Sequence, residues 1–345
     1  MDTFIDYISS LDYWRTHVLP AGGLPPPRDG RVAEGIDALF ERSHPTSSEL
    51  PADELERLGF PLEGLSLLVP SQRARVSNAS FETRVWGGRL PAAAFHRVSE
   101  HVYICTPEFV LLRMASVAGT SDMDASGALA CVVSLAFELC GGYALSATDD
   151  RGFIDRLPVM TAASLGDLLL DAGSANGILL ARRARDLVLE GTASPMEAVM
   201  AATLTLPRRL GGYGLSGPIA NHRVDVPDHA RGMSGQAFYL LDLCYPDAKC
   251  DVEYDSEGFH ANAAGMERDA KRRNTLSYLG YETITVTNGQ LRSVSRMDQV
   301  ARQVAKAIGK KWKKVAYDDV SLRVELRRNL LAYRGCLPPV GERHP

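Results

Sequence analysis

The chain has 345 residues, of which 45% are apolar, and a formal net charge of −4. This length predicts two or three domains with cores of their own. The slightly acidic balance argues against a globally basic nucleic-acid-binding protein, but it allows local basic patches. The six cysteines form no C-x-x-C pair and stand in apolar surroundings. We therefore expect buried, reduced thiols and neither a zinc site nor a disulfide framework.

No targeting or membrane segment is predicted. The N-terminus, M-D-T-F-I-D-Y, is too acidic and not apolar enough for a signal peptide. The longest apolar run, 128–137, is far too short to span a bilayer. These features predict a cytoplasmic protein that does not enter the membrane, and they give no indication of its oligomeric state.

The first half of the chain predicts short helices and strands in alternation. We expect a helix at 2–19, a break at the Pro-rich segment 21–27, and a short helix at 53–59. Strands are predicted at 64–70, 81–86 and 101–105. Thr106 is the expected N-cap of a helix with Pro107 in its first turn, and further helices are expected at 128–139 and within 165–190.

The second half predicts a compact α/β unit. The motif S-P-M-E at 194–197 is typical of a capping box, with Ser194 as N-cap and Glu197 three residues later. Strands are expected at 236–245, 249–256 and 281–287, with a helix at 263–279 before the last strand. The resulting domains are an N-terminal helical region (1–60), an α/β region (61–190), an α/β domain (191–315) and a C-terminal helix and tail (316–345).

Three carboxylates in the second half are candidates for a metal site. If the first two of these strands form a hairpin about the turn at 246–248, Asp242 lies directly opposite Glu253. Asp255 shares the face of Glu253 because alternate residues of a strand point the same way; Asp251 does too, nearer the turn. Crowded carboxylates repel one another, and Mg²⁺ or Mn²⁺ would remove that repulsion. The alternative is that these acids form the solvated face of an antiparallel sheet.

Candidate catalytic and phosphate-binding residues follow. His260 could act as a general base or hold a water molecule, since its pKa lies near neutrality; it could equally be a solvated loop residue. The next helix carries cations that suit phosphate oxygens or a solvated face, and the basic segment 306–314 could lie along phosphates with Trp312 stacking or be a solvated helix. The predicted phosphate-binding or DNA-binding residues are Arg268, Lys271, Arg272, Arg273, Lys310, Lys311 and Lys313.

These motifs resemble the PD-(D/E)XK nuclease superfamily, and in particular its very-short-patch-repair-like domains. The shared pattern is Asp242, the Tyr-Pro turn at 245–246, E-Y-D at 253–255, His260, R-D-A-K-R at 268–272 and L-x-x-x-G-Y at 276–281. The resemblance implies a restriction-endonuclease-like core, a mixed sheet flanked by helices, with Asp242 and Glu253 as metal ligands. The superfamily's catalytic lysine is Asp255 here, and Lys271 or Arg268 are the candidates to replace it.

A second resemblance concerns residues 65–145. The segments L-S-L-L-V-P, V-W-G-G-R-L-P and V-Y-I-C-T-P-E-F are similar to the central region of abortive-infection antitoxin-like proteins. Two functions are therefore expected as alternatives. One is a Mg²⁺-dependent endonuclease acting on DNA; the other is a non-catalytic DNA-binding regulator of antitoxin type, with a possible toxin partner, that uses the nuclease-like fold as a scaffold.

Overall fold

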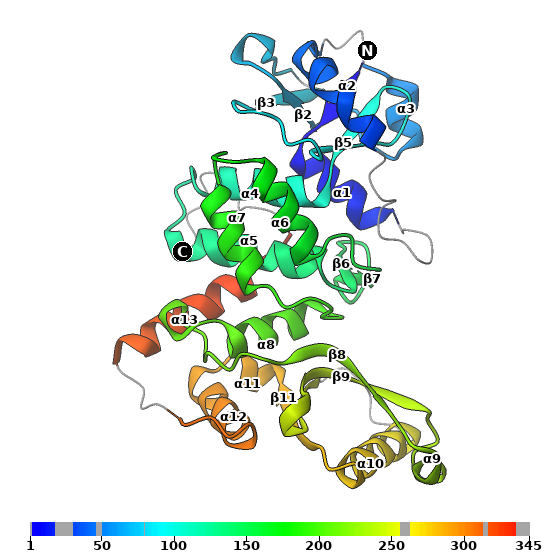
Figure 1. Ribbon diagram of the computed structural model, residues 1–345, viewed down its shortest axis with the longest axis vertical. Helices are drawn as coiled ribbons and strands as arrows, with labels where there is room; N and C mark the ends of the chain where they lie inside the picture. Colours follow the sequence, from blue (N-terminus) through cyan, green and yellow to red (C-terminus); the bar gives the residue numbers. More distant parts are fainter. Residues whose placement is uncertain are drawn as a thin grey trace. The chain divides into compact units, whose positions relative to one another are not determined.

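The computed structural model describes residues 2–17, 30–45, 50–78, 80–255, 263–312 and 317–335. It is a mixed α/β structure that divides into two compact units (Figure 1). The first unit contains Met1–Val188 together with Tyr333–Pro345, and the second contains Leu189–Ala332. The chain therefore leaves the first unit once and returns to it after completing the second.

A five-stranded sheet forms one part of the first unit. Its order is β3-β2-β1-β5-β4, with β1 (Thr3–Ile5), β2 (Leu65–Val69), β3 (Phe81–Val85), β4 (Phe95–Arg97) and β5 (Val102–Cys105). The central strand β1 is parallel to β5 and antiparallel to β2. The sequence predicts a helix from residue 2, whereas α1 spans Tyr7–Thr16. Residues 3–5 are a strand because all three side chains are buried in the sheet.

Helices make up the rest of this unit, as Figure 1 shows. They are α2 (Gly30–Glu41), α3 (Ala52–Arg57), α4 (Pro107–Ala118), α5 (Ala125–Leu139), α6 (Ala162–Asp171) and α7 (Ile178–Leu187), with a small hairpin of β6 (Tyr143–Leu145) and β7 (Phe153–Asp155). The predicted cap is confirmed, since the Thr106 hydroxyl accepts a hydrogen bond from the Phe109 amide. The sequence predicts separate regions at 1–60 and 61–190, but the pairing of β1 with β2 and β5 joins them in one sheet.

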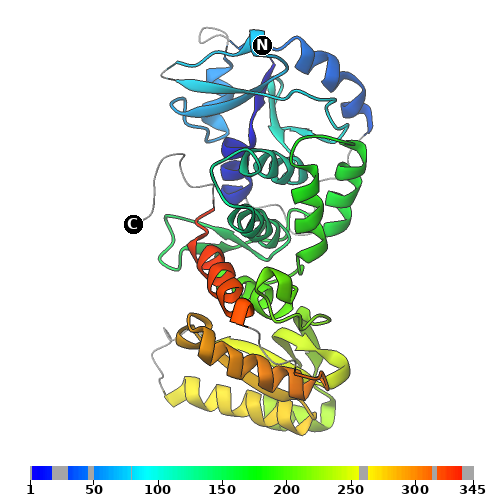
Figure 2. The same cartoon turned by 90° about the vertical axis from the view of Figure 1, so that its left-hand side faces the viewer.

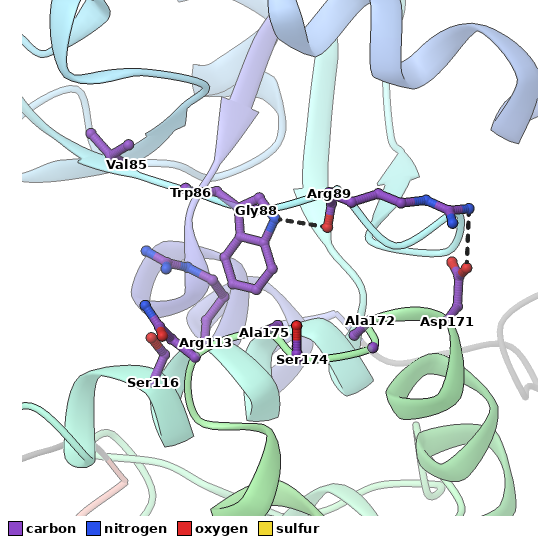
Figure 3. Close-up of a pocket in the computed structure, with 13 residues that line it drawn as sticks. Val85, Trp86, Gly88, Arg89, Arg113, Ser116, Asp171, Ala172, Ser174 and Ala175 are labelled. Atoms are coloured by element: carbon purple, nitrogen blue, oxygen red, sulfur yellow. Dashed lines mark hydrogen bonds and ion pairs between the residues drawn. The ribbon is translucent and has the colours of Figure 1, made fainter.

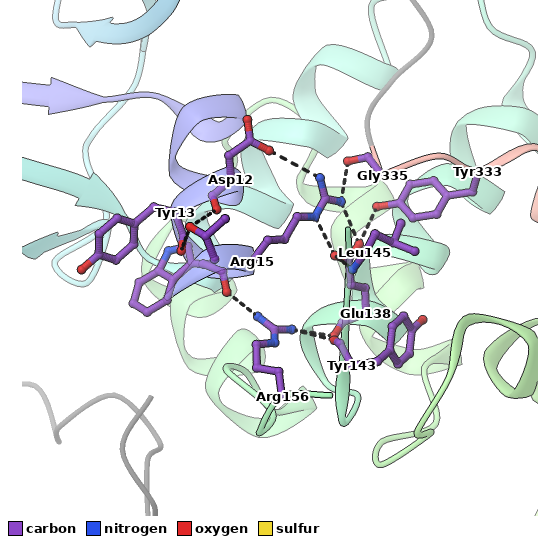
Figure 4. A network of polar contacts seen from close by, with 11 residues as sticks. Asp12, Tyr13, Arg15, Glu138, Tyr143, Leu145, Arg156, Tyr333 and Gly335 are labelled. Carbon is purple, nitrogen blue, oxygen red and sulfur yellow. Dashed lines mark hydrogen bonds and ion pairs between the residues drawn. The ribbon is translucent and has the colours of Figure 1, made fainter. Parts of the chain in front are cut away.

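Two buried ion pairs stabilise the first unit. Arg113 donates two hydrogen bonds of 2.8 Å to the carboxylate of Asp6, and both side chains are almost completely buried. Arg15 donates to both carboxylate oxygens of Glu138 and also to the carbonyl of Gly335 (Figure 4). The Tyr333 hydroxyl lies 3.3 Å from Glu138. The residues after α13 (Tyr317–Ala332) thus complete a polar network inside the first unit.

The second unit is built on a four-stranded mixed sheet. Its order is β11-β10-β9-β8, with β8 (Ile219–Asp225), β9 (Phe238–Tyr245), β10 (Cys250–Asp255) and β11 (Glu282–Thr287). β9 is antiparallel to both β8 and β10, whereas β11 is parallel to β10. The helices of this unit are α8 (Pro195–Thr205), α9 (Asp228–Ser234), α10 (Ala263–Tyr278), α11 (Asn288–Leu291), α12 (Val294–Ala307) and α13 (Tyr317–Ala332).

The strands and helices predicted for this unit at 236–287 are confirmed to within two residues. Gly280 ends the turn after α10 with a φ angle of +86°, a conformation that favours glycine. Gly211 also has a positive φ, and an added Cβ would collide with the backbone of Leu322 in α13. This close approach explains why a glycine stands at position 211.

Two predictions of a general kind are tested in the described parts of the chain. The five cysteines there are free and buried, as expected, while Cys336 lies outside them. None of the described helices combines the length and the apolar character needed to cross a bilayer.

Candidate functional site

The predicted hairpin register is confirmed. Cys250 pairs with Tyr245 and Val252 with Leu243, so the next pair in this register is Asp242 and Glu253. Directly opposed residues of antiparallel strands point to the same face of the sheet. The turn at 246–248 thus places these two carboxylates beside each other.

The strands part at this point. The pairing of β9 with β10 ends at Leu243 and Val252, although both strands continue beyond it. Asp242 extends into the opening, where its carboxylate accepts a hydrogen bond of 2.8 Å from the amide of Tyr254. A side-chain oxygen therefore replaces the backbone carbonyl that would normally satisfy this amide.

Asp242 lies in surroundings that disfavour its charge. Burial, together with the nearby carboxylates of Glu253 and Glu197, raises its pKa to about 8. The Tyr254 amide and Arg272 oppose this rise but do not cancel it. At neutral pH a proton or a cation is therefore favoured at this carboxyl group.

Glu253 is paired with a cation from α10. The guanidinium of Arg272 donates a short hydrogen bond to the Glu253 carboxylate and another of 2.7 Å to the carbonyl of Leu240. It also lies over the ring of Tyr239, 5.3 Å from its centroid. The Leu240 carbonyl can accept this bond because β9 has already separated from β10.

Glu197 is a site residue that the sequence assigned only to a helix cap. The predicted cap exists, since the Ser194 hydroxyl accepts from the Glu197 amide, but the Glu197 carboxylate accepts from the amide of Ala193. Burial raises the pKa of Glu197, and the charge of Glu253 contributes to the rise. α8 thus brings a third carboxylate to the opening between the strands.

Asn221 borders the same opening from β8. The flanking pairs Ala220–Leu243 and His222–Leu241 place Asn221 opposite Asp242. Its φ angle is +48°, a conformation that asparagine tolerates better than most residues. Its side-chain amide donates to the carbonyl of Gly191 and also lies within hydrogen-bonding reach of Glu197. It therefore links β8 to the segment that leads into α8.

Asp251 is the second residue that sequence reasoning undervalued. It faces the same side as Glu253, as predicted, but it is fully buried. Neither carboxyl oxygen has a hydrogen-bond donor among the described residues. Burial, together with the neighbouring Glu253, raises the pKa of Asp251 to about 9. The contact with Glu253 is favourable when one of the two carboxyl groups carries a proton.

The remaining predicted residues lie outside this cluster. Asp255 is exposed at the end of β10, where it pairs with Thr287 in β11. Arg268 and Arg273 are exposed on α10, and Lys271 pairs with Glu267 at 2.7 Å on the outer side of that helix. His260 lies outside the described residues. Of the cations predicted on α10, Arg272 reaches a carboxylate of the cluster.

The basic segment after α12 takes a different form from the predicted helix, because α12 ends at Ala307. Lys310 donates to the carbonyl of Gly214 at 2.9 Å, and Lys311 is exposed. Lys313 lies outside the described residues. Trp312 is half-buried beside Tyr213, which leaves its ring less free to stack than expected.

The donor atoms of the cluster are of the kind that binds a divalent ion, but they are not arranged as a complete metal site. Its donors are carboxylate oxygens, the ligands that Mg²⁺ and Mn²⁺ prefer, and Asp251 has two buried oxygens without a donor. Nevertheless, no group of three or more His, Cys, Asp or Glu side chains in the described part of the chain is arranged to hold a metal ion. Arg272 occupies the place beside Glu253 that an ion would take.

A pocket in the first unit is a weaker candidate. It has a volume of about 420 Å³ and lies between the Trp86–Arg89 segment, α4 and the residues after α6 (Figure 3). Its charged side chains already have partners, since Arg113 pairs with Asp6 and Arg89 with Asp171. The indole of Trp86 donates to the carbonyl of Arg89. The pocket thus lacks an unpaired charge that would select a ligand.

Comparisons with protein-family models, with curated proteins and with solved structures found no match to this chain.

Proposed function

We propose that the second unit is a metal-dependent endonuclease that cleaves phosphodiester bonds in DNA. The observation that carries the proposal is the meeting of Glu197, Asp242 and Glu253 where β9 and β10 part. Burial and the neighbouring charge of Glu253 disfavour negative charge on Asp242 and Glu197, and binding of Mg²⁺ or Mn²⁺ would offset this repulsion. The order α8-β8-α9-β9-β10-α10-β11 around a mixed sheet supports a restriction-endonuclease-like core as part of this proposal.

Each residue has a role in the proposed reaction. A bound divalent ion would stabilise charge on the phosphate and lower the pKa of the attacking water. Glu253, once it binds the ion, no longer needs the guanidinium of Arg272, which then becomes available for a phosphate oxygen. The exposed Asp255 would orient water, and His260 would accept its proton. Arg268 and Arg273, both exposed on α10, would contact the flanking backbone.

A second candidate function is a non-catalytic DNA-binding regulator of antitoxin type. The ion pair between Arg272 and Glu253 favours it, since this pair neutralises Glu253 without a metal. In such a protein the carboxylates would only maintain the sheet, and a toxin would be the partner. The two functions differ in whether the carboxylates bind an ion.

Calorimetric titration with Mg²⁺ and Mn²⁺ tests the proposal, followed by cleavage and binding assays on DNA. We expect the natural protein to bind one or two ions and the Asp242→Asn and Glu253→Gln variants to lose this binding. The same variants should lose cleavage while they keep most of their affinity for DNA. Asp247→Asn is the matched control, because Asp247 is exposed in the turn of the same hairpin.

Absence of ion binding with and without DNA would overturn the endonuclease proposal. If the protein and its carboxylate variants then bind DNA equally well, the regulator becomes the better description. A loss of folding in the variants is detected by circular dichroism. Asp255→Asn, at an exposed strand end beside the cluster, then provides a second variant, which should lose cleavage if Asp255 orients the water.

A further inference from the structure

The segment around α12 carries an uncompensated positive charge on its solvent side. Between residues 288 and 312 there are six Lys or Arg residues and a single carboxylate, Asp298. That carboxylate is directed inward, where it accepts from the Tyr213 hydroxyl at 2.6 Å and from Arg323 at 2.7 Å. The outer side of the segment is therefore basic without an acidic neighbour of its own.

Four of these cations form what we call the α12 basic face: Arg292, Arg296, Arg302 and Lys306. All four are exposed, and none forms an ion pair with a described carboxylate. The opposite side of α12 is buried through Met297, Val300, Ala301, Val304 and Ala305. Because this apolar side fixes α12 on the unit, the cations that the helix carries belong to an ordered element, which Figure 2 draws in orange, and not to a free tail.

The α12 basic face begins shortly after the end of β11, the strand that pairs with β10. Thr287 at the end of β11 pairs with Asp255 at the end of β10, because the two strands are parallel and in register. The chain passes from Thr287 directly into α11 and then into Arg292. The α12 basic face thus follows the end of β11 that lies beside Asp255, two residues beyond Glu253 of the cluster. From Arg296 to Lys306 it extends by about 15 Å at the helical rise of 1.5 Å per residue.

Its composition favours the backbone of duplex DNA over other polyanions. A duplex presents closely spaced phosphates that Lys and Arg neutralise. Proteins that bind single strands use exposed aromatic rings for stacking, whereas Trp312 is half-buried between Tyr213 and the guanidinium of Arg302. A membrane-binding helix inserts apolar residues into lipid, but the described residues of this segment include no exposed large hydrophobic side chain.

We propose that the α12 basic face binds the phosphate backbone of duplex DNA beside the carboxylate cluster. This inference rests on the proposed function for the choice of substrate. It assigns to Arg292, Arg296, Arg302 and Lys306 the task of orienting the duplex, which is separate from cleavage.

Fluorescence anisotropy with a labelled duplex in EDTA tests the inference, because binding is then measured without cleavage. The test variant is Arg292→Gln, Arg296→Gln and Lys306→Gln combined; Arg302 is kept because it covers Trp312 at 5.3 Å. We expect the Kd to rise roughly tenfold or more at 0.1 M salt. The slope of log Kd against log salt should fall by about 2 to 3, at about 0.9 per lost phosphate contact.

The matched control combines Arg209→Gln, Arg231→Gln and Arg328→Gln, three exposed positions of the same unit with the same change in net charge. We expect this variant to bind nearly as tightly as the natural protein. Equal affinities and salt slopes for the test and control variants would overturn the inference, even if the protein cleaves DNA. Conversely, a protein that never cleaves but depends on the face for binding would refute the nuclease and support the inference.

Sedimentation with phosphatidylcholine–phosphatidylserine vesicles tests whether the α12 basic face binds an anionic membrane instead of DNA. We expect no binding that depends on the α12 basic face. Vesicle binding that the test variant loses, together with unchanged affinity for duplex DNA, would show that the face serves a membrane and would overturn the inference.

Discussion

Asp251 allows a direct measurement of how strongly the hairpin disfavours negative charge. Its carboxyl group is fully buried and has no described hydrogen-bond donor, and burial raises its pKa from 3.8 to about 9. Because the pKa is higher in the folded state, folding takes up a proton between about pH 4 and pH 9. The stability of the natural protein therefore falls as the pH rises through this window. Asparagine has the same shape but does not titrate, so Asp251→Asn should remove the part of this fall that Asp251 causes, while Asp242 continues to contribute its own part.

The size of this pH effect follows from the number of protons that the protein takes up on folding. One proton changes the free energy of unfolding by about 1.4 kcal/mol per pH unit. Between pH 5 and pH 7 we expect the variant to gain about 3 kcal/mol relative to the natural protein, or roughly 100-fold in the opening equilibrium of the hairpin. Hydrogen exchange of peptides from β9 and β10, read by mass spectrometry, measures this opening locally. Comparing the two proteins at each pH cancels the intrinsic pH dependence of exchange.

The control and the refuting result are equally specific. Asp247→Asn alters an exposed carboxylate in the same hairpin, and we expect its exchange to match the natural protein at both pH values. If the ratio of the exchange rates of Asp251→Asn and the natural protein is the same at pH 5 and pH 7, Asp251 is ionised in the folded protein. The account of the site as a place that rejects negative charge would then be wrong.

Three further predictions concern stability. Arg113→Met leaves Asp6 charged and buried, and we expect a loss of about 3–5 kcal/mol in urea unfolding; adding Asp6→Asn should restore most of it. Gly211→Ala directs a methyl group into the backbone of α13, and we expect calorimetry to show a melting temperature lower by about 5 °C or more, with little change for Gly232→Ala, which has open space around it. Thr106→Ala removes the cap of α4 and should cost about 1 kcal/mol in thermal unfolding, while Thr106→Ser retains the cap.

The hairpin of the second unit could be predicted because its determinants are local. Pro246 and Asp247 indicate a turn between two strands of alternating character, and the position of the turn fixes which residues oppose each other. The start of α4 could be predicted for the same reason, because its N-cap and first turn are adjacent in sequence. The mixed α/β class followed from the order of such local elements.

The parts that could not be predicted depend on distant contacts. Thr3 pairs with Val102, almost one hundred residues away, and three residues are too few to show a strand period. Glu197 fits a helix cap as well as a site, and the difference arises only when α8 packs on β9 and β10. One feature of the sequence indicated a role for Glu197, namely a carboxylate near a helix N-terminus, where negative charge is stabilised. The burial of Asp251 likewise depends on what covers the sheet.

The return of the chain to the first unit affects the order of folding during synthesis. Tyr333 and Gly335 contribute to the contacts around Arg15 and Glu138, but a ribosome makes them after the whole second unit. The second unit is one uninterrupted stretch, 189–332, and has all of its own residues before those last two contacts become available. The part of the protein that is translated first is therefore the part that is finished last, and a nascent chain halted at residue 332 would hold Glu138 through Arg15 without the tyrosine.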